Sequence, residues 1–243
     1  MIRVIFSFLY WMFTVVSSII LIPIACIIWC FNIIFDRKLA ILHMFGSFWG
    51  SLYLWVNPLW KLKIYNRKNF KKGQVYIIVS NHQSLADIFV LYRLFFHYKW
   101  VVKAELFKVP ILGWNLALNR YIKLARGNTG GILKMMKDCE KALKQGSSLL
   151  IFPEGTRSVD GNLKRFKEGA FKIALAAKVP ILPIVISGTN KAIPDKRLLL
   201  GGNQKIKVKV LEAITYESFC DLNASELAKK VHAVMNKKIN ELA

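Results

Sequence analysis

The sequence has few acidic side chains, because 14 aspartates and glutamates are outnumbered by 36 lysines and arginines. The resulting formal net charge of +22 points to an anionic partner, either a nucleic acid or a lipid surface. Apolar residues are not scarce: 54% of the chain is hydrophobic and 13% is aromatic, which excludes a disordered protein. At 243 residues the chain is long enough for one sizeable core.

Charge is almost absent from the beginning of the chain. No formally charged side chain occurs in the 32 residues from Val4 to Phe35, or between Leu39 and Trp60. A helix needs about 20 apolar residues to cross a bilayer, so residues 1–60 are predicted to form hydrophobic, membrane-anchoring helices. The first stretch fits either a crossing or a bend near Pro23. A monotopic hairpin stays open, because basic residues occur before, between and after the two stretches.

Two further absences concern chemistry. The four cysteines have the spacing of neither a disulfide framework nor a zinc site, so no metal is expected and the domain after the apolar stretches is predicted to face a reducing cytoplasm. In a bacterium this location would be the inner membrane. The G-x-S-x-G motif is also missing, which argues against Ser80 or Ser84 as an exposed serine nucleophile.

Short apolar runs alternate with helical patterns through residues 61–243, which we predict to be a single α/β domain. The predicted strands lie at 75–80, within 99–106, at 147–152, at 180–187 and around 206–210. The predicted helices lie at about 84–96, 129–145 and 170–179, with another after Asn223, where Glu226 completes a capping pattern. This alternation predicts an α/β fold with a mixed, largely parallel sheet flanked by helices.

A polar stretch, "NHQSLAD", directly follows the first predicted strand. Residues five apart in a continuous helix lie about 140° apart, so His82 and Asp87 meet more easily if His82 lies in a loop and Asp87 in a helix's first turn. Ser84 fits the N-cap of that helix. A carboxylate beside an imidazole holds one tautomer and leaves the other nitrogen as a general base. The same residues also fit a plain helix cap with His82 as a polar loop residue.

A second polar stretch, "FPEGTRS", follows the strand predicted at 147–152 and begins a loop too long for a simple connection. Gly155 allows the backbone to approach a ligand closely, and Arg157 offers a two-pronged donor for phosphate. Glu154 and Arg157 equally fit an ion pair that only stabilises a turn. The stretch alone leaves both interpretations open.

In their order, "NHQSLAD", "VVKAELFKVPILGW", "YIKLAR", "FPEGTRS" and "VPILPIVI" resemble the motifs of the membrane-bound glycerolipid acyltransferase family, whose bacterial members include 1-acylglycerol-3-phosphate acyltransferases. The resemblance extends from about Lys61 to Glu212. It implies transfer of an acyl chain from acyl-CoA or acyl-carrier protein to the sn-2 hydroxyl of 1-acylglycerol 3-phosphate, giving phosphatidic acid. No cofactor is implied. The implied partners are the lysophospholipid, a membrane phospholipid surface and an acidic acyl-carrier protein.

The resemblance also implies roles for single residues. His82 is expected to activate the acceptor hydroxyl as a general base, and Asp87 to orient it. The expected substrate-binding residues are Lys103, Arg126 and Arg157 at the phosphate, with Glu154, Gly155 and Thr156 shaping the loop. The family often has a small residue and an aspartate before the arginine at position 126, whereas "NRYIKLAR" has Asn119 and Arg120 followed by Ala125. Another lysophospholipid or an aminolipid therefore stays open as the acceptor.

Two other classes of function compete with the enzyme. A nucleic-acid-binding protein needs an aromatic platform or a recognition helix among its basic residues, and the sequence has no such signature, so no nucleic-acid partner is expected. A non-catalytic lipid-binding scaffold stays open. It differs from the enzyme by predicting that His82→Ala leaves biological activity intact.

Overall fold

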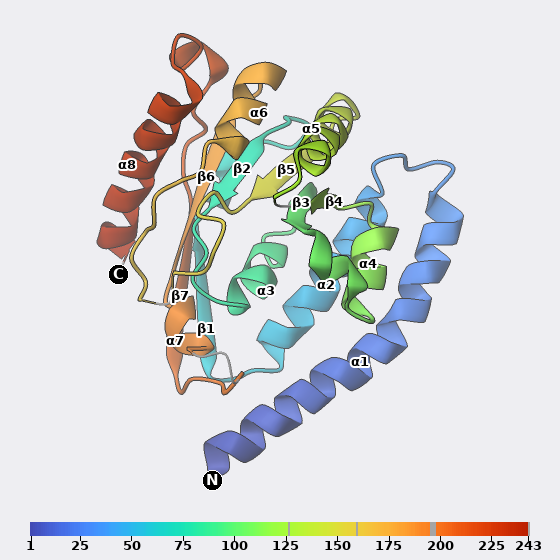
Figure 1. The fold of residues 1–243 in the computed structure, drawn as a ribbon. Coiled ribbons are helices and arrows are strands. Elements are labelled where there is room, and N and C mark those ends of the chain that lie inside the picture. The colour runs from blue at the N-terminus through green and yellow to red at the C-terminus, as the bar shows by residue number, and fades with distance from the viewer. Residues whose placement is uncertain (126, 159, 195–197, 243) are drawn as a thin grey trace.

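A computed structural model describes residues 1–125, 127–158, 160–194 and 198–242, which contain one seven-stranded sheet (Figure 1). Its strands are β1 (Trp60–Tyr65), β2 (Ile77–Ser80), β3 (Tyr98–Lys103), β4 (Ile122–Leu124), β5 (Ser148–Ile151), β6 (Ile181–Ser187) and β7 (Gln204–Val210). They lie in the order β1-β7-β6-β2-β5-β3-β4, and the β6–β7 pair alone is antiparallel among the described strands. The predicted mixed, largely parallel sheet is confirmed.

Helices cover both faces of this sheet. Successive side chains of a strand point to opposite faces, so a strand that is apolar throughout needs cover on both. Along β2, Ile78 belongs to the core beneath α2 (Ala40–Trp55) and α3 (Ala86–Tyr92), whereas Ile77 and Val79 belong to the core on the other face. That second core is covered by α5 (Thr129–Lys144), α6 (Gly169–Ala177) and α8 (Ala224–Leu242). Burial on both faces explains why β2 is a continuous apolar run.

The remaining helices are short, apart from α1. They are α4 (Leu112–Leu118), α7 (Thr189–Ala192) and the 3₁₀ turns Arg67–Asn69, Ala104–Lys108 and Tyr216–Ser218. The predicted cap of α8 is confirmed, since Asn223 Oδ1 accepts from the backbone N–H of Glu226 at 3.0 Å and Glu226 Oε2 accepts from the N–H of Asn223 at 2.9 Å. Strands β1 and β4 and helix α4 were not predicted from the sequence.

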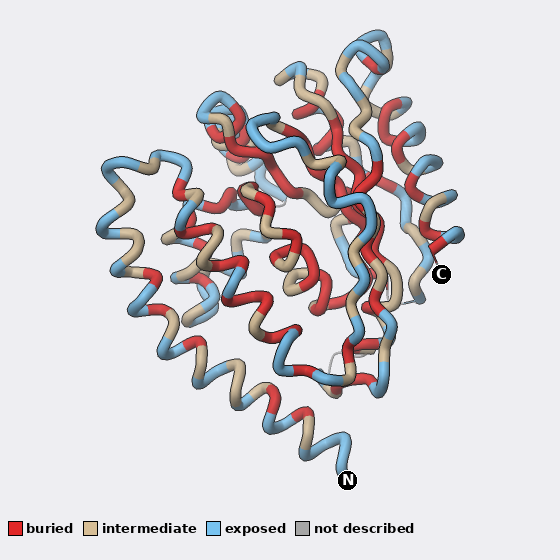
Figure 2. The backbone as a smooth tube through the Cα atoms, turned by 180° about the vertical axis from the view of Figure 1, so that it is seen from behind, coloured by how far each residue is buried: buried red, intermediate tan, exposed pale blue. Residues whose placement is uncertain are grey.

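Helix α1 (Ile2–Asn32) lies along the outside of α2 (Figures 1 and 2). The buried residues of α1 have helical spacing and form one stripe that faces the rest of the fold. They are Ser7, Tyr10, Ser18, Ile22 and Ala25. Most of its other apolar side chains are exposed. The helix continues through Pro23, so the chain does not turn back there. Among the described residues, α1 is the helix long and apolar enough to cross a membrane, and the predicted apolar N-terminal helix is confirmed.

Helix α2, which the sequence groups with the anchor, packs against α3. A side chain at Gly50 would have its Cβ 2.9 Å from Tyr92, so only glycine permits this approach without a shift. His43 is fully buried: its Nε2–H donates to the Phe96 carbonyl and its Nδ1 accepts from the Tyr121 hydroxyl, both at 2.8 Å. Burial holds the pKa of His43 well below its usual value, so the ring is neutral. Residues 1–60 therefore include one largely exposed helix and one helix of the packed body.

Candidate active site

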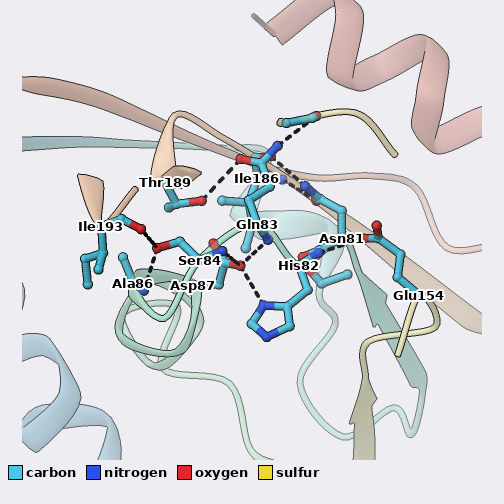
Figure 3. Close-up of polar contacts among 12 residues, drawn as sticks. Asn81, His82, Gln83, Ser84, Ala86, Asp87, Glu154, Ile186, Thr189 and Ile193 are labelled. Atoms are coloured by element: carbon cyan, nitrogen blue, oxygen red, sulfur yellow. Dashed lines mark hydrogen bonds and ion pairs between the residues drawn. The ribbon is translucent and has the colours of Figure 1, made fainter. Parts of the chain in front are cut away.

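Polar segments from distant parts of the sequence meet beyond the carboxyl ends of the central strands (Figure 3). Strand β5 pairs in parallel with β2 on one side and with β3 on the other, so the carboxyl ends of all three strands lie together. His82 follows β2, Glu154 follows β5, and Lys103 ends β3. Ligands of open α/β sheets generally bind beyond the carboxyl ends of the strands.

His82 and Asp87 are in direct contact, at 2.8 Å between Nδ1 and Oδ2. As the spacing predicts, His82 lies in the loop after β2, and Asp87 is the second residue of α3. The Asp87 side chain is fully buried, and its Oδ2 also accepts from the backbone N–H groups of Gln83 at 2.6 Å and Ser84 at 2.9 Å. These donors hold the carboxylate in place, so it fixes the Nδ1 edge of the imidazole and leaves Nε2 on the opposite edge.

Helix α3 is shorter than predicted, since it begins at Ala86 and ends at Tyr92 instead of spanning about 84–96. The helix begins one residue later than a cap at Ser84 implies, with Leu85 before it, but the predicted capping contact is present, because Asp87 Oδ2 accepts from the Ser84 N–H at 2.9 Å. The Ser84 hydroxyl still accepts from the Ala86 N–H at 3.3 Å. After the helix, Phe95 adopts a left-handed conformation with φ 53°, which turns the chain away from the helical path.

Two amides hold the loop that carries His82. The Asn81 side chain pairs with the backbone of Ile186 on β6, donating to its carbonyl and accepting from its N–H, both at 2.8 Å. The Gln83 side chain donates to the Gly161 carbonyl at 3.2 Å and accepts from the Thr189 hydroxyl at 3.2 Å (Figure 3). His82 therefore lies between two anchored neighbours. Sequence reasoning missed both amides, whose only local signal is their place beside His82.

Glu154 connects the two polar segments. One carboxylate oxygen accepts from the backbone N–H of His82 at 2.8 Å, and the other accepts from the N–H of Lys164 at 3.0 Å. The side chain is buried, and burial raises its pKa above the usual value, although both hydrogen bonds and the nearby cations oppose this shift. With both oxygens occupied by backbone donors, Glu154 shapes the loop. Its partners are these N–H groups rather than the guanidinium of Arg157.

The loop after β5 turns sharply and then runs across the site. Gly155 has φ +71°, a conformation that favours glycine, while Thr156 and Arg157 are exposed. The backbone of Arg157 is held, because its carbonyl accepts from the Lys164 ammonium at 2.6 Å. The backbone N–H of Ser158 donates to the His82 carbonyl at 2.8 Å. The exposed side chain of Arg157 therefore lies on a loop that is hydrogen-bonded to the backbone of His82.

The other two predicted cations are less closely defined. Lys103 is exposed at the carboxyl end of β3, at the same end of the sheet as His82. It pairs in register with Leu124 of β4. Arg126, two residues beyond Leu124 in the chain, lies outside the described residues, so the prediction for it stays a prediction.

The arrangement is suited to removing a proton rather than to holding a metal. An imidazole with one nitrogen bound to a buried carboxylate can take a proton at the other nitrogen, and the carboxylate stabilises the resulting imidazolium. In the described part of the chain, no group of three or more histidine, cysteine, aspartate or glutamate side chains is placed to hold a metal ion. At the carboxyl ends of the central strands, the structure therefore places an imidazole paired with a carboxylate, with exposed cations at Lys103 and Arg157 on neighbouring segments.

Known proteins share both the sequence pattern and the fold. The Acyltransferase family model matches residues 61–187. A chloroplastic 1-acyl-sn-glycerol-3-phosphate acyltransferase of Brassica napus is 34% identical over 223 residues, covering 91% of this chain and 64% of that relative. The 1-acyl-sn-glycerol-3-phosphate acyltransferase of Saccharomyces cerevisiae is 35% identical over 185 residues, covering 74% of this chain and 60% of that one.

A solved structure agrees with these relatives. The crystal structure of the 1-acyl-sn-glycerophosphate acyltransferase PlsC from Thermotoga maritima matches with a TM-score of 0.78 and 26% sequence identity, over 99% of this chain and 97% of that one. The chain thus has the α/β fold of that acyltransferase, with a histidine and an aspartate paired after β2. The chain belongs to the acyltransferase family, although it spans less than two thirds of the length of the Brassica and Saccharomyces relatives.

Proposed function

We propose that this protein transfers a fatty acyl chain from a thioester, acyl-CoA or acyl-carrier protein, to the sn-2 hydroxyl of 1-acylglycerol 3-phosphate. The product is phosphatidic acid, for phospholipid synthesis. The observation that carries the proposal is the 2.8 Å contact between His82 and the buried Asp87 in a chain of the acyltransferase family. Relatives that bear the name 1-acyl-sn-glycerol-3-phosphate acyltransferase support this acceptor.

The reaction follows from the geometry of the pair. His82 Nε2 takes the proton of the acceptor hydroxyl as its oxygen attacks the thioester carbonyl, and Asp87 stabilises the imidazolium that forms. The tetrahedral adduct then breaks its carbon–sulfur bond, and the departing thiolate receives the proton from the imidazolium. One ester bond forms and one thioester bond breaks, so no redox partner is needed. The thioester is already activated, and alignment and proton removal are the main tasks left to the protein.

The acceptor's phosphate is assigned to the cations around the loop after β5. Arg157 is exposed on a backbone held by Lys164, and Lys103 is exposed at the end of β3. Arg126 is assigned to the same phosphate from the sequence motif. A guanidinium binds phosphate through paired, charge-assisted hydrogen bonds, which is why Arg157 is given the largest share.

Arg157→Ala is expected to raise the acceptor KM or lower kcat/KM, because one charge-assisted phosphate contact is lost. The expected loss is about 1.5 to 3 kcal/mol in transition-state binding. Steady-state kinetics with varied acceptor and saturating donor measure it. Arg165→Ala is the matched control, since it removes another exposed arginine from the same loop. Acceptor kinetics unchanged from those of the control would remove Arg157 from the phosphate site.

The proposed setting is a membrane surface, with the catalytic domain on the cytoplasmic side. The exposed apolar side chains of α1 supply hydrophobic area, and the net charge of +22 favours anionic phospholipid. Both features suit an enzyme whose acceptor resides in the bilayer. The same basic surface suits an acidic acyl-carrier protein as the donor's carrier.

A different acceptor is the second candidate, and the segment before Arg126 favours it. Asn119 and Arg120 stand where the family often has a small residue and an aspartate. In the structure Asn119 is buried, its carbonyl accepts from the buried Lys99 ammonium at 2.7 Å, and Arg120 has φ 51°. Another lysophospholipid or an aminolipid is therefore tested beside 1-acylglycerol 3-phosphate.

A further inference from the structure

The imidazole of His82 lies flat against an aromatic ring. The rings of His82 and Phe152 have centroids 4.0 Å apart and planes inclined by 11°, which is a stacked arrangement. Phe152 is the first residue after β5, and His82 is the second residue after β2, the strand beside it. The contact therefore joins the two polar segments directly through their side chains, in addition to the backbone contacts made by Glu154.

A second ring supports Phe152. The centroid of the Trp100 ring on β3 lies 5.7 Å from that of Phe152, with planes inclined by 37°, and Trp100 is almost completely buried. Strands β3, β5 and β2 are consecutive in the sheet, so each contributes to a series of rings that leads from the core to His82. Phe152 is only partly buried, and its place is set by the ring behind it as well as by its own strand.

We infer that Phe152 is a positioning residue that sets the plane of the catalytic imidazole. The Asp87 contact fixes one point on the ring edge, but a single hydrogen bond leaves the ring free to tilt about it. The side-chain torsion of histidine next to the ring is broad, so it does not fix the plane either. Stacking against Phe152 removes the tilt and thereby fixes the direction in which Nε2 points. This inference rests on the proposed function of His82 as the base.

The stacked face has a second effect on the reaction. Imidazole becomes imidazolium when it takes the acceptor's proton, and the face of an aromatic ring attracts a cation. Phe152 also excludes water from one face of the imidazole, while the ring edge that carries Nε2 is left for substrate. A planar aromatic residue is needed for both effects. An aliphatic residue of similar size fills the space without supplying either of them.

The test compares Phe152→Leu with Phe152→Tyr. The leucine variant is expected to lower kcat by about tenfold to hundredfold, as misalignment of a catalytic group does, with the acceptor KM within about threefold of wild type. The tyrosine variant retains a planar ring and is expected to keep kcat within about threefold. Phe70→Leu is the matched control, because Phe70 stacks on Phe96 at 3.9 Å and 8°, away from His82. It is expected to keep kcat and to show a similar change in thermal midpoint.

A leucine variant with wild-type kcat would overturn the inference, and so would equal losses in the leucine and tyrosine variants. If the leucine variant fails to fold, Phe152→Met is judged by the same criteria, because methionine occupies more of the space but has no plane. Failure of the proposed function is distinguishable. In that case wild type transfers no acyl chain to 1-acylglycerol 3-phosphate, and the variants are compared on whichever lysophospholipid wild type uses.

Discussion

The His82→Ala protein is expected to lose about 10²- to 10⁴-fold in kcat, while it folds and associates with membranes like wild type. Without the imidazole that contacts Asp87, the site lacks the base proposed to remove the acceptor's proton. The His82 side chain is partly exposed, at 15%, so its removal leaves little empty space in the core. Kinetics, thermal unfolding and sedimentation with lipid vesicles measure the three properties separately.

His232→Ala is the control for removing an imidazole elsewhere. His232 contacts Phe166 on the opposite side of the sheet, with ring centroids 5.0 Å apart, and has no part in the proposed site. Its variant is expected to keep wild-type kcat. Near-normal turnover by the His82→Ala protein would favour the non-catalytic lipid-binding scaffold, which requires no base.

Asp87→Asn is expected to lower kcat by about 10²- to 10⁴-fold with little change in the acceptor KM. Asparagine retains an oxygen that can accept from the backbone N–H groups of Gln83 and Ser84, so the loop is preserved. The negative charge that stabilises the imidazolium is lost. Steady-state kinetics give kcat and KM, and the thermal midpoint reports any loss of folding.

Asp138→Asn supplies the matched control, because Asp138 forms an exposed pair with Lys134 on α5, at 3.2 Å. Exposed pairs of this kind contribute little to stability. If the Asp87 and Asp138 variants retained the same kcat, the carboxylate beside His82 would have no role in proton transfer.

Most of the sheet could be predicted from the sequence because its central strands are buried on both faces. Strands β2, β5 and β6 are short apolar runs bounded by polar or turn residues, which is a strong local signal. Strand β1, "WKLKIY", alternates lysine with apolar residues at the edge of the sheet, and β4 has only three residues. A strand of three residues is too short to stand out, whereas the alternation in β1 is the same signal that identifies β7, "QKIKVKV", and could have predicted β1 as well. The packing of helix α2 against α3 could not be predicted from the sequence for a different reason, since a buried helix and a membrane helix are both apolar.

The candidate site was predictable only where its contacts are local. His82 and Asp87 are five residues apart, so their contact requires only a local loop and helix turn, which the spacing favours together with a plain helix cap. Glu154 and His82 are 72 residues apart, and their hydrogen bond depends on the alignment of β2 with β5. The stacking of Phe152 depends on the same alignment. Neither contact leaves a pattern in the sequence, because strand order is a property of the whole fold.

The central claim is that the protein acylates 1-acylglycerol 3-phosphate. It is tested most directly by incubating purified protein with a panel of lysophospholipids, with acyl-CoA and acyl-carrier protein as alternative donors. The expected result is a fast conversion of 1-acylglycerol 3-phosphate to phosphatidic acid, which the His82→Ala protein does not catalyse. Robust transfer to lysophosphatidylglycerol, with none to 1-acylglycerol 3-phosphate, would contradict the proposed acceptor.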